Sequence, residues 1–294
     1  MILVTGGTGF IGPRVVHALR GRDLPVRCLV RRPDRAATLA SWGCELVEGD
    51  MTDAESLRRA CEGADVVVHL VAIIKGAPDD FERIMMRGTR DLVAAAEAAG
   101  ARRIVLMSAL GTSEETRELV PYYRAKWTME ETVLRSPLEH VIFRPSFVFG
   151  RDGGVLPTFI RQVRWSPVTT VIGPGDQRLQ PIWVEDVAAH FAAAVDHPGA
   201  AGETFDLGGP DAVTWNELYE RIRRTLGKRR ATVHVPFGMM RAVAALTERL
   251  AGAPITRDQL TMLAHGDNVG DIEPARAVFG VRLTGLDEQL RRAV

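Results

Sequence analysis

The chain has 294 residues, a length that suits one large α/β domain or a large domain with a smaller lobe. Hydrophobic residues make up 46% of the chain, which is enough for a full core and excludes wholesale disorder. Lysine plus arginine and aspartate plus glutamate number 37 each. This balance lacks the basic excess that nucleic-acid binding usually requires, so we expect no nucleic-acid partner.

The three cysteines, Cys28, Cys44 and Cys61, lie in or beside apolar stretches without a CxxC spacing, which is typical of buried free thiols in a reducing compartment. A strand-like run begins at Ile2, so we expect no signal peptide. The longest apolar run, 64–74, is too short to span a bilayer. These features predict a cytoplasmic protein without a transmembrane segment, and they leave peripheral membrane association open.

The first half alternates short β-branched runs with longer helical patterns. The predicted strands are 2–5, 25–30, 45–48, 66–70, 103–107 and 140–143. The predicted helices are 10–20, 36–42, 54–61, 81–99 and 121–135. Alternating strands and helices with right-handed crossovers predict an α/β fold, a Rossmann-type doubly wound parallel sheet.

The second half has a different composition. Gly and Pro are frequent over 150–181, which favours loops. Beyond it we predict strands near 204–207 and 231–235 and helices at 214–226, 237–250 and 257–264. We therefore expect a dinucleotide-binding domain over 1–150, with segments at about 178–207 returning to it, and a smaller substrate or partner lobe over 151–294.

The strongest motif is the glycine-rich turn at 5–12, between the first strand and the first helix. Gly6, Gly9 and Gly12 have the GxxGxxG spacing of a dinucleotide-binding turn. Such glycines permit a tight turn, close approach of the main chain to a diphosphate, and close packing of helix and strand, while the helix N-terminus attracts the anion. The expected cofactor ligands here are Gly6, Thr8, Gly9, Phe10, Ile11 and Gly12.

The end of the second strand indicates which dinucleotide binds. NAD-preferring domains usually place an acid there, but this chain has Val30 followed by Arg31 and Arg32, and guanidinium groups suit a 2′-phosphate. We therefore favour NADP(H), with NAD(H) still possible because Asp34 could act as a displaced ribose ligand. Asp50, after the third strand, could hydrogen-bond the adenine or cap the next helix, and the sequence does not decide between these two roles.

Several stretches resemble the short-chain dehydrogenase/reductase superfamily in its extended or atypical branch. They are the glycine turn, Val67–Leu70, Gly88–Val93, Tyr122 with Lys126, and Arg144–Gly150. Narrower stretches are similar to bacterial relatives of the NAD(P)H-binding accessory subunit of mitochondrial complex I, a group often described as NAD-dependent epimerase/dehydratase-like. These stretches are His69–Ile74, Met107–Gly111, Thr256–Leu260 and Asp267–Val269. The resemblance adds further expected cofactor ligands, namely Met51, Leu70, Val71, Ala72, Lys126 and Pro145.

The same resemblance implies a catalytic set of Tyr122, Lys126 and Ser108. The four-residue spacing puts Tyr122 and Lys126 on one helix face, where an ammonium group should lower the pKa of the phenol. Tyr122 could then exchange a proton with a substrate oxygen, Lys126 could hold the ribose, and Ser108 could orient the substrate. Three residues depart from the superfamily pattern: Met85 replaces a relay Asn, Val71 a smaller residue, and Phe149 a Tyr.

Other residues have weaker patterns. The scattered histidines predict no metal site, and His69 in a strand of buried character is better explained as a hydrogen-bonded core residue than as a base. Ser108 lacks the setting of a hydrolase nucleophile. The apolar stripe of helix 237–250 favours a packing face, with a lipid- or quinone-facing surface as the alternative.

Three functions fit the sequence. The first is an NADP(H)-dependent oxidoreductase acting on a carbonyl or hydroxyl group of an unknown small molecule. The second is a non-catalytic nucleotide-binding accessory or assembly protein of a respiratory or quinone-related complex, and the third is a nucleotide-sugar epimerase or dehydratase. Helical patterns leave open whether the chain is a monomer or a homodimer.

Overall fold

The computed structural model describes residues 1–248 and 255–294. The chain divides into two compact units, each assembled from three stretches of sequence. Unit 1 comprises Met1–Pro145, Val184–Leu207 and Asp271–Arg282, and unit 2 comprises Ser146–Trp183, Gly208–Gly270 and Leu283–Val294. Two stretches from the second half of the chain therefore complete the unit that begins at the N-terminus.

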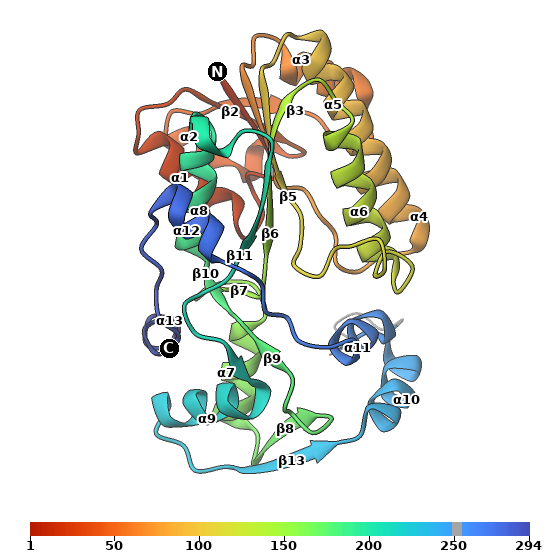
Figure 1. The fold of residues 1–294 in the computed structure, drawn as a ribbon, viewed down its shortest axis with the longest axis vertical. Coiled ribbons are helices and arrows are strands. Elements are labelled where there is room, and N and C mark those ends of the chain that lie inside the picture. The colour runs from red at the N-terminus through yellow and green to blue at the C-terminus, as the bar shows by residue number, and fades with distance from the viewer. Residues whose placement is uncertain (249–254) are drawn as a thin grey trace. The chain divides into compact units, whose positions relative to one another are not determined.

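Unit 1 is built on a seven-stranded parallel sheet (Figure 1). The strands in sheet order are β3 (Glu45–Glu48), β2 (Val26–Val30), β1 (Ile2–Thr5), β4 (Val66–His69), β5 (Arg103–Met107), β6 (Glu139–Pro145) and β11 (Glu203–Leu207). The order reverses between β1 and β4, and open α/β sheets bind ligands beyond the carboxyl ends of the strands at such a point. The Rossmann-type α/β fold predicted from the sequence is confirmed.

Helices cover both faces of this sheet (Figure 1). One face carries α1 (Gly12–Arg20), α2 (Ala37–Ser41), α8 (Val184–Ala194) and α12 (Glu273–Phe279). The other face carries α3 (Ala54–Cys61), α4 (Pro78–Asp80), α5 (Gly88–Ala98) and α6 (Pro121–Leu134). Short 3₁₀ turns occur at Pro33–Arg35 and Pro198–Ala200. The cysteines Cys28, Cys44 and Cys61 are buried free thiols, as predicted.

The sequence predicts one α-helix over 81–99, but the structure has two different helical forms there. Phe81–Arg87 forms a π-helix, and α5 continues from Gly88. The π-helix brings Met85 into the core, where its side chain is fully buried. π-Helical turns are rare and frequently lie at functional sites.

Unit 2 contains three short strand pairs and five described helices. The strands are β7 (Val148–Phe149) parallel to β10 (Ile182–Trp183), β9 (Arg178–Leu179) antiparallel to β12 (Val213–Thr214), and β8 (Val168–Ile172) parallel to β13 (Ala231–Val235). The helices are α7 (Leu156–Trp165), α9 (Trp215–Thr225), α10 (Phe237–Thr247), α11 (Arg257–Ala264) and α13 (Leu286–Ala293). Buried side chains of α7, α9 and α13 and of the short strands form a separate core around Trp183, Trp215 and Leu290.

The prediction of loops over 150–181 is wrong in part. Helix α7 buries Leu156, Ile160 and Val163 on one face, and β8 pairs with β13. The predicted helix 237–250 ends at Thr247 in the structure, and Leu250 lies outside the described residues. No helix in the described part of the chain is both long enough and apolar enough to span a bilayer.

Candidate functional site

The glycine-rich turn lies between β1 and α1. Gly6 has a φ of +79°, and a Cβ there would lie 3.1 Å from the main chain of Leu70 and Val71. Gly9 donates its N–H to the Gly6 carbonyl at 3.0 Å. A Cβ at Gly12 would lie only 2.2 Å from that same carbonyl oxygen. The turn is therefore folded so tightly that Gly6 and Gly12 cannot be replaced without distorting it.

At the start of α1 the N–H groups of Phe10, Ile11 and Gly12 have no acceptor among the described residues, whereas Pro13 has no N–H and the Arg14 N–H donates to the Ile11 carbonyl at 3.1 Å. Ile11 occupies the N-cap without a side-chain hydrogen bond, and no acidic residue lies in the first turn. Thr8 and Gly9 are exposed, and Phe10 and Ile11 are half-buried. Uncapped N–H groups at the positive end of a helix dipole suit a diphosphate, so the observed cradle fits the dinucleotide implied by the sequence.

A fully buried histidine lies behind this turn. Thr89 donates its hydroxyl to the Met85 carbonyl at 2.5 Å, so its oxygen accepts from His69 Nε2 at 3.0 Å. His69 Nδ1 then accepts from the Thr5 hydroxyl at 2.6 Å. Burial and the charge of Lys126 lower the pKa of His69 to about 3. The imidazole is therefore neutral and fully hydrogen-bonded, as expected of a core histidine rather than a base.

The carboxyl ends of β2 and β3 border an open hollow of about 480 Å³. Its lining residues are Arg31, Glu48, Gly49, Asp50, Asp53 and Arg59. Arg31 is exposed and forms no hydrogen bond or ion pair with any residue that the structure describes. Arg32, in contrast, pairs with Asp34 at 3.0 Å. Of the two predicted phosphate ligands, only Arg31 lines this hollow, and it has no ion-pair partner among the described residues.

Asp50 does not cap the next helix. Its carboxylate accepts hydrogen bonds from the Thr52 N–H at 2.8 Å and the Thr52 hydroxyl at 2.7 Å. The N-cap of α3 is Asp53, which accepts from the Glu55 N–H at 3.0 Å. The capping alternative for Asp50 is therefore wrong, and its place beside Arg31 leaves the nucleotide role as a prediction.

The segment after β4 forms an apolar wall. The Leu70 N–H donates to the Thr5 carbonyl at 3.1 Å, which fixes the start of this segment against β1. Val71 and Ala72 are half-buried and pack on the same core as Met51. Met85 lies in that core, where its sulfur accepts a hydrogen bond from the Ile73 N–H at 3.5 Å. Met85 therefore supports the wall and provides no proton relay.

The expected catalytic residues meet at the end of β5. Lys126 on α6 is fully buried, and its Nζ donates to the Met107 carbonyl at 2.6 Å, directly before Ser108. The same Nζ lies 5.9 Å from the centre of the Tyr122 ring. Ser108 is buried, and its N–H donates to the Phe143 carbonyl at 2.7 Å. Lys126 therefore bonds the main chain next to Ser108 and lies near the ring of Tyr122.

The expected pKa of Tyr122 is wrong in direction. Burial raises the pKa of Tyr122 above its ordinary value of 10.0, and the charge on Tyr123 adds to the shift. The Lys126 ammonium is hydrogen-bonded to a main-chain carbonyl and does not offset the burial. Burial also lowers the pKa of Lys126 to about 7, with a smaller opposing effect from Glu130. Tyr122 in this structure is thus a neutral phenol at physiological pH.

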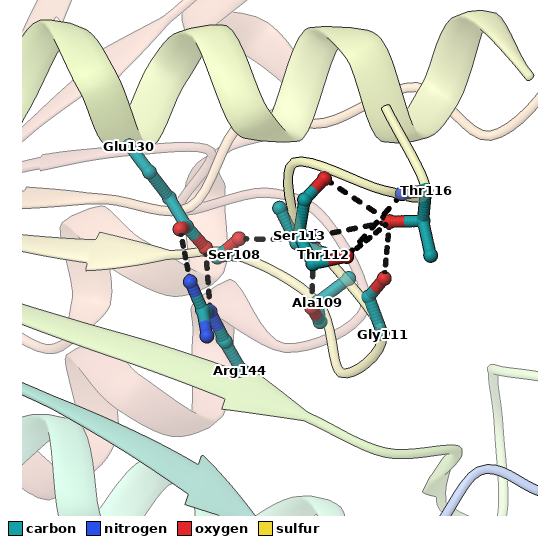
Figure 2. A network of polar contacts seen from close by, with 8 residues as sticks. All are labelled: Ser108, Ala109, Gly111, Thr112, Ser113, Thr116, Glu130 and Arg144. Carbon is teal, nitrogen blue, oxygen red and sulfur yellow. Dashed lines mark hydrogen bonds and ion pairs between the residues drawn. The ribbon is translucent and has the colours of Figure 1, made fainter. Parts of the chain in front are cut away.

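A polar network surrounds Ser108 (Figure 2). The Ser108 hydroxyl lies 3.5 Å from the Thr112 hydroxyl, which in turn donates to the Ala109 carbonyl at 2.8 Å. Thr116 donates to the Gly111 carbonyl at 2.6 Å. These bonds order the loop that joins β5 to α6, so the chain around Ser108 is fixed by neighbouring hydroxyl groups.

Sequence reasoning missed the ion pair of Glu130 and Arg144, which Figure 2 also shows. Arg144 donates to both carboxylate oxygens of the buried Glu130, at 2.9 and 2.5 Å. The signal available in the sequence was the four-residue spacing between Lys126 and Glu130, which places both on one face of α6. Pro145 ends β6 beside this pair, and its carbonyl accepts from the Leu110 N–H at 3.0 Å.

Among the described residues, no group of three or more His, Cys, Asp or Glu side chains is placed to hold a metal ion. The parallel sheet, the glycine cradle and the buried lysine instead define a Rossmann-type nucleotide-binding protein. The chain belongs to the NAD-dependent epimerase/dehydratase family, whose model matches residues 2–208.

Two relatives and one solved structure are informative. Ceramide reductase of Caulobacter vibrioides is 31% identical over 238 residues, covering 80% of this chain and 74% of that protein. Subunit 9 of the NADH dehydrogenase [ubiquinone] 1 alpha subcomplex of Rattus norvegicus is 28% identical over 306 residues, or 98% and 79% of the two chains. A crystal structure of the Escherichia coli NADPH-dependent quinone oxidoreductase with NADPH has a TM-score of 0.82, with 21% identity and coverage of 99% and 98%. The resemblances inferred from the sequence are confirmed at the level of the family.

Proposed function

We propose that this chain is an NADP(H)-dependent oxidoreductase, which reduces a carbonyl substrate with NADPH or oxidises the corresponding alcohol with NADP⁺. The observation that carries the proposal is the fully buried Lys126, which donates to the Met107 carbonyl and has no acidic partner within hydrogen-bond reach among the described residues. A buried ammonium is costly, and an apolar residue would stabilise this core position better. A lysine at this buried position is explained if its ammonium group binds a ligand, here the nucleotide.

The expected cofactor ligands follow the carboxyl edge of the sheet in unit 1. The turn of Gly6, Gly9 and Gly12 would hold the diphosphate, the residues after β4 would border the nicotinamide, and Lys126 would donate to the ribose hydroxyls. A bound nicotinamide supplies or accepts a hydride. Arg31 and Asp50 would hold the adenosine end, and the unpaired charge of Arg31 supports NADP(H) over NAD(H).

Tyr122 is the proposed acid. Because burial raises the pKa of Tyr122, the phenol keeps its proton at neutral pH and can donate it to a carbonyl oxygen that gains negative charge. The Ser108 hydroxyl donates to the Thr112 hydroxyl at 3.5 Å in this structure, and by rotating it would instead donate a second hydrogen bond to the substrate oxygen. We further propose that unit 2 supplies the residues that recognise the substrate or a partner.

The test is Tyr122→Phe, with Tyr123→Phe as the matched control on the same helix turn. We expect turnover of a carbonyl panel with NADPH to fall about 100- to 10,000-fold in Tyr122→Phe and less than about 3-fold in Tyr123→Phe. Calorimetry should show unchanged NADPH affinity in both variants. Equal loss of turnover in the two variants would refute the catalytic role of Tyr122.

A second candidate function is a nucleotide-holding accessory protein of a respiratory or quinone-related complex. The specific observation in its favour is Met85, which occupies the place of a relay Asn and hydrogen-bonds the Ile73 N–H through sulfur. The similarity to the rat complex I subunit supports the same view. This function predicts stoichiometric NADPH binding without turnover of carbonyls, quinones or nucleotide sugars, and co-purification with a membrane complex.

A further inference from the structure

One segment of unit 2 departs from the charge balance of the rest of the chain. Residues 228–247 contain four cationic side chains and no aspartate or glutamate, although the whole chain has 37 residues of each sign. The cations are Lys228, Arg229, Arg230 and Arg241. None of them forms an ion pair with any residue that the structure describes. The segment therefore has a net positive charge that the fold does not neutralise.

The same segment exposes large apolar side chains on α10. Met239 is 61% exposed and Leu246 is 81% exposed, and only Ala244 of this helix is buried. Val233 on β13 is also exposed. Single exposed apolar side chains are ordinary, but several on one helix and the adjoining strand make this segment a candidate contact surface.

An exposed tryptophan lies at the other end of β13. Trp165 ends α7 and is 77% exposed. Strands β8 and β13 are parallel, and Val168 pairs with Ala231. Trp165 precedes Val168 by three residues and Arg230 directly precedes Ala231, so the indole and the basic residues lie at the same end of this strand pair. Figure 1 shows β13 running from there to α10.

We propose that this surface, formed by Trp165 and residues 228–247, binds an anionic lipid bilayer. Exposed aliphatic, thioether and indole groups can enter the interfacial region of a membrane while unpaired Lys and Arg contact acidic headgroups. A nucleic acid would use the cations without the apolar groups, and an apolar protein partner would leave the cations unpaired. The inference concerns a surface of unit 2 and does not depend on the proposed reaction.

The experiment is flotation of the purified full chain with two kinds of vesicle, phosphatidylcholine alone and phosphatidylcholine with roughly one third phosphatidylserine. We expect at least about 10-fold tighter binding to the anionic vesicles, and weaker binding as salt is raised. Equal binding to both kinds of vesicle, or no binding to either, would overturn the proposal. These measurements use the unaltered protein, so they stand even if a variant fails to fold.

Variants then test whether this surface is the part of the chain that binds the vesicles. Joint replacement of the exposed Lys228, Arg229 and Arg241 by Gln should weaken binding roughly 100-fold, since each cation near such a membrane contributes about 1 kcal/mol. A control with the same charge change, Arg58→Gln, Arg90→Gln and Arg135→Gln in unit 1, should bind as the wild type does. If both triple variants lose affinity equally, net charge and not this surface determines binding, and the proposal fails.

The apolar part is tested by Met239→Ser with Leu246→Ser. We expect about 10-fold weaker binding to anionic vesicles, because two side chains no longer leave water. The control is Leu134→Ser on α6, which is 45% exposed in unit 1 and should have no effect. If the double variant binds as tightly as the wild type, the protein attaches to the membrane by charge alone. That result would overturn the proposal that these apolar side chains enter the bilayer.

Discussion

The two ends of the nucleotide site are built in different ways. At the proposed diphosphate end the expected contacts come from the main chain of Gly6–Gly12, where Gly6 and Gly12 have no room for a Cβ. At the proposed nicotinamide end the expected contacts come from side chains, the buried Lys126 and Ser108 and the half-buried Tyr122, whose chemistry depends on what surrounds them. The comparison teaches that a binding turn can be identified from spacing alone, whereas reactivity depends on burial and on hydrogen-bond partners that spacing does not reveal.

The largest effect is expected at the diphosphate end, from Gly12→Ala. The new Cβ would lie 2.2 Å from the Gly6 carbonyl oxygen and 2.7 Å from the main chain of Gly7, so the turn must open. We expect loss of measurable NADPH binding by calorimetry and destabilisation of about 3 kcal/mol or more in urea unfolding. Gly238→Ala is the control, because nothing lies within 4 Å of a Cβ there. Wild-type affinity in Gly12→Ala would show that this turn does not form the site.

At the proposed nicotinamide end, we expect Lys126→Met to lower turnover strongly while changing the free energy of unfolding only a little. We expect turnover to fall about 100-fold or more, because the ribose and the acid lose their positioning group. The free energy of unfolding at pH 7 should change by less than about 2 kcal/mol, since an apolar side chain of similar length replaces a buried charge.

The pH dependence of stability checks the same variant. Lys126 has a pKa of about 7 when folded and an ordinary value of 10.5, so between these values the unfolded chain binds a proton that the folded chain lacks. The wild type should therefore gain stability as the pH rises through this window, and Lys126→Met should lose that gain. An unchanged slope would mean that Lys126 keeps an ordinary pKa in the folded chain and that burial does not favour its neutral form.

The difference between the glycine-rich turn and the buried side chains also explains which features could be predicted from the sequence. Strands such as Ile2–Thr5 and Arg103–Met107 match their predictions because short β-branched runs between helices are a local signal. Helix α7 was missed because neighbouring Gly and Pro residues obscured a helical stripe of Leu156, Ile160 and Val163. The raised pKa of Tyr122 could not be foreseen, because burial and the Met107 acceptor of Lys126 arise only from tertiary packing.

A smaller effect is expected at the adenosine end, where two adjacent arginines differ in their partners. Arg31 is unpaired among the described residues and lines the hollow, while Arg32 pairs with Asp34. We expect Arg31→Ala to lower the preference for NADPH over NADH about 10-fold, because a charge-assisted contact to the 2′-phosphate is lost. Arg32→Ala should change the preference less than about 3-fold. A larger effect in Arg32→Ala would reverse the assignment of the phosphate ligand.

An effect on stability, and the smallest effect on nucleotide binding, is expected behind the diphosphate turn, at His69. Its ring connects Thr5, directly before the glycines, to Thr89 on α5. Because the pKa of His69 falls to about 3 from an ordinary 6.5, the unfolded chain takes up a proton first as the pH drops below about 6.5, and stability is lost there. His69→Gln can accept from Thr5 and donate to Thr89 but cannot titrate.

We therefore expect His69→Gln to cost about 1 to 3 kcal/mol at pH 7, from imperfect hydrogen bonds, and to lose less stability than the wild type between pH 6.5 and 5. The slope removed cannot exceed about 1.4 kcal/mol per pH unit, the value for one proton. Urea unfolding of both proteins at these pH values measures the difference. If the two slopes coincide, protonation of His69 does not cause the loss of stability below pH 6.5. The glycine-rich turn would then be held against the core by packing and not by the hydrogen bonds of this imidazole.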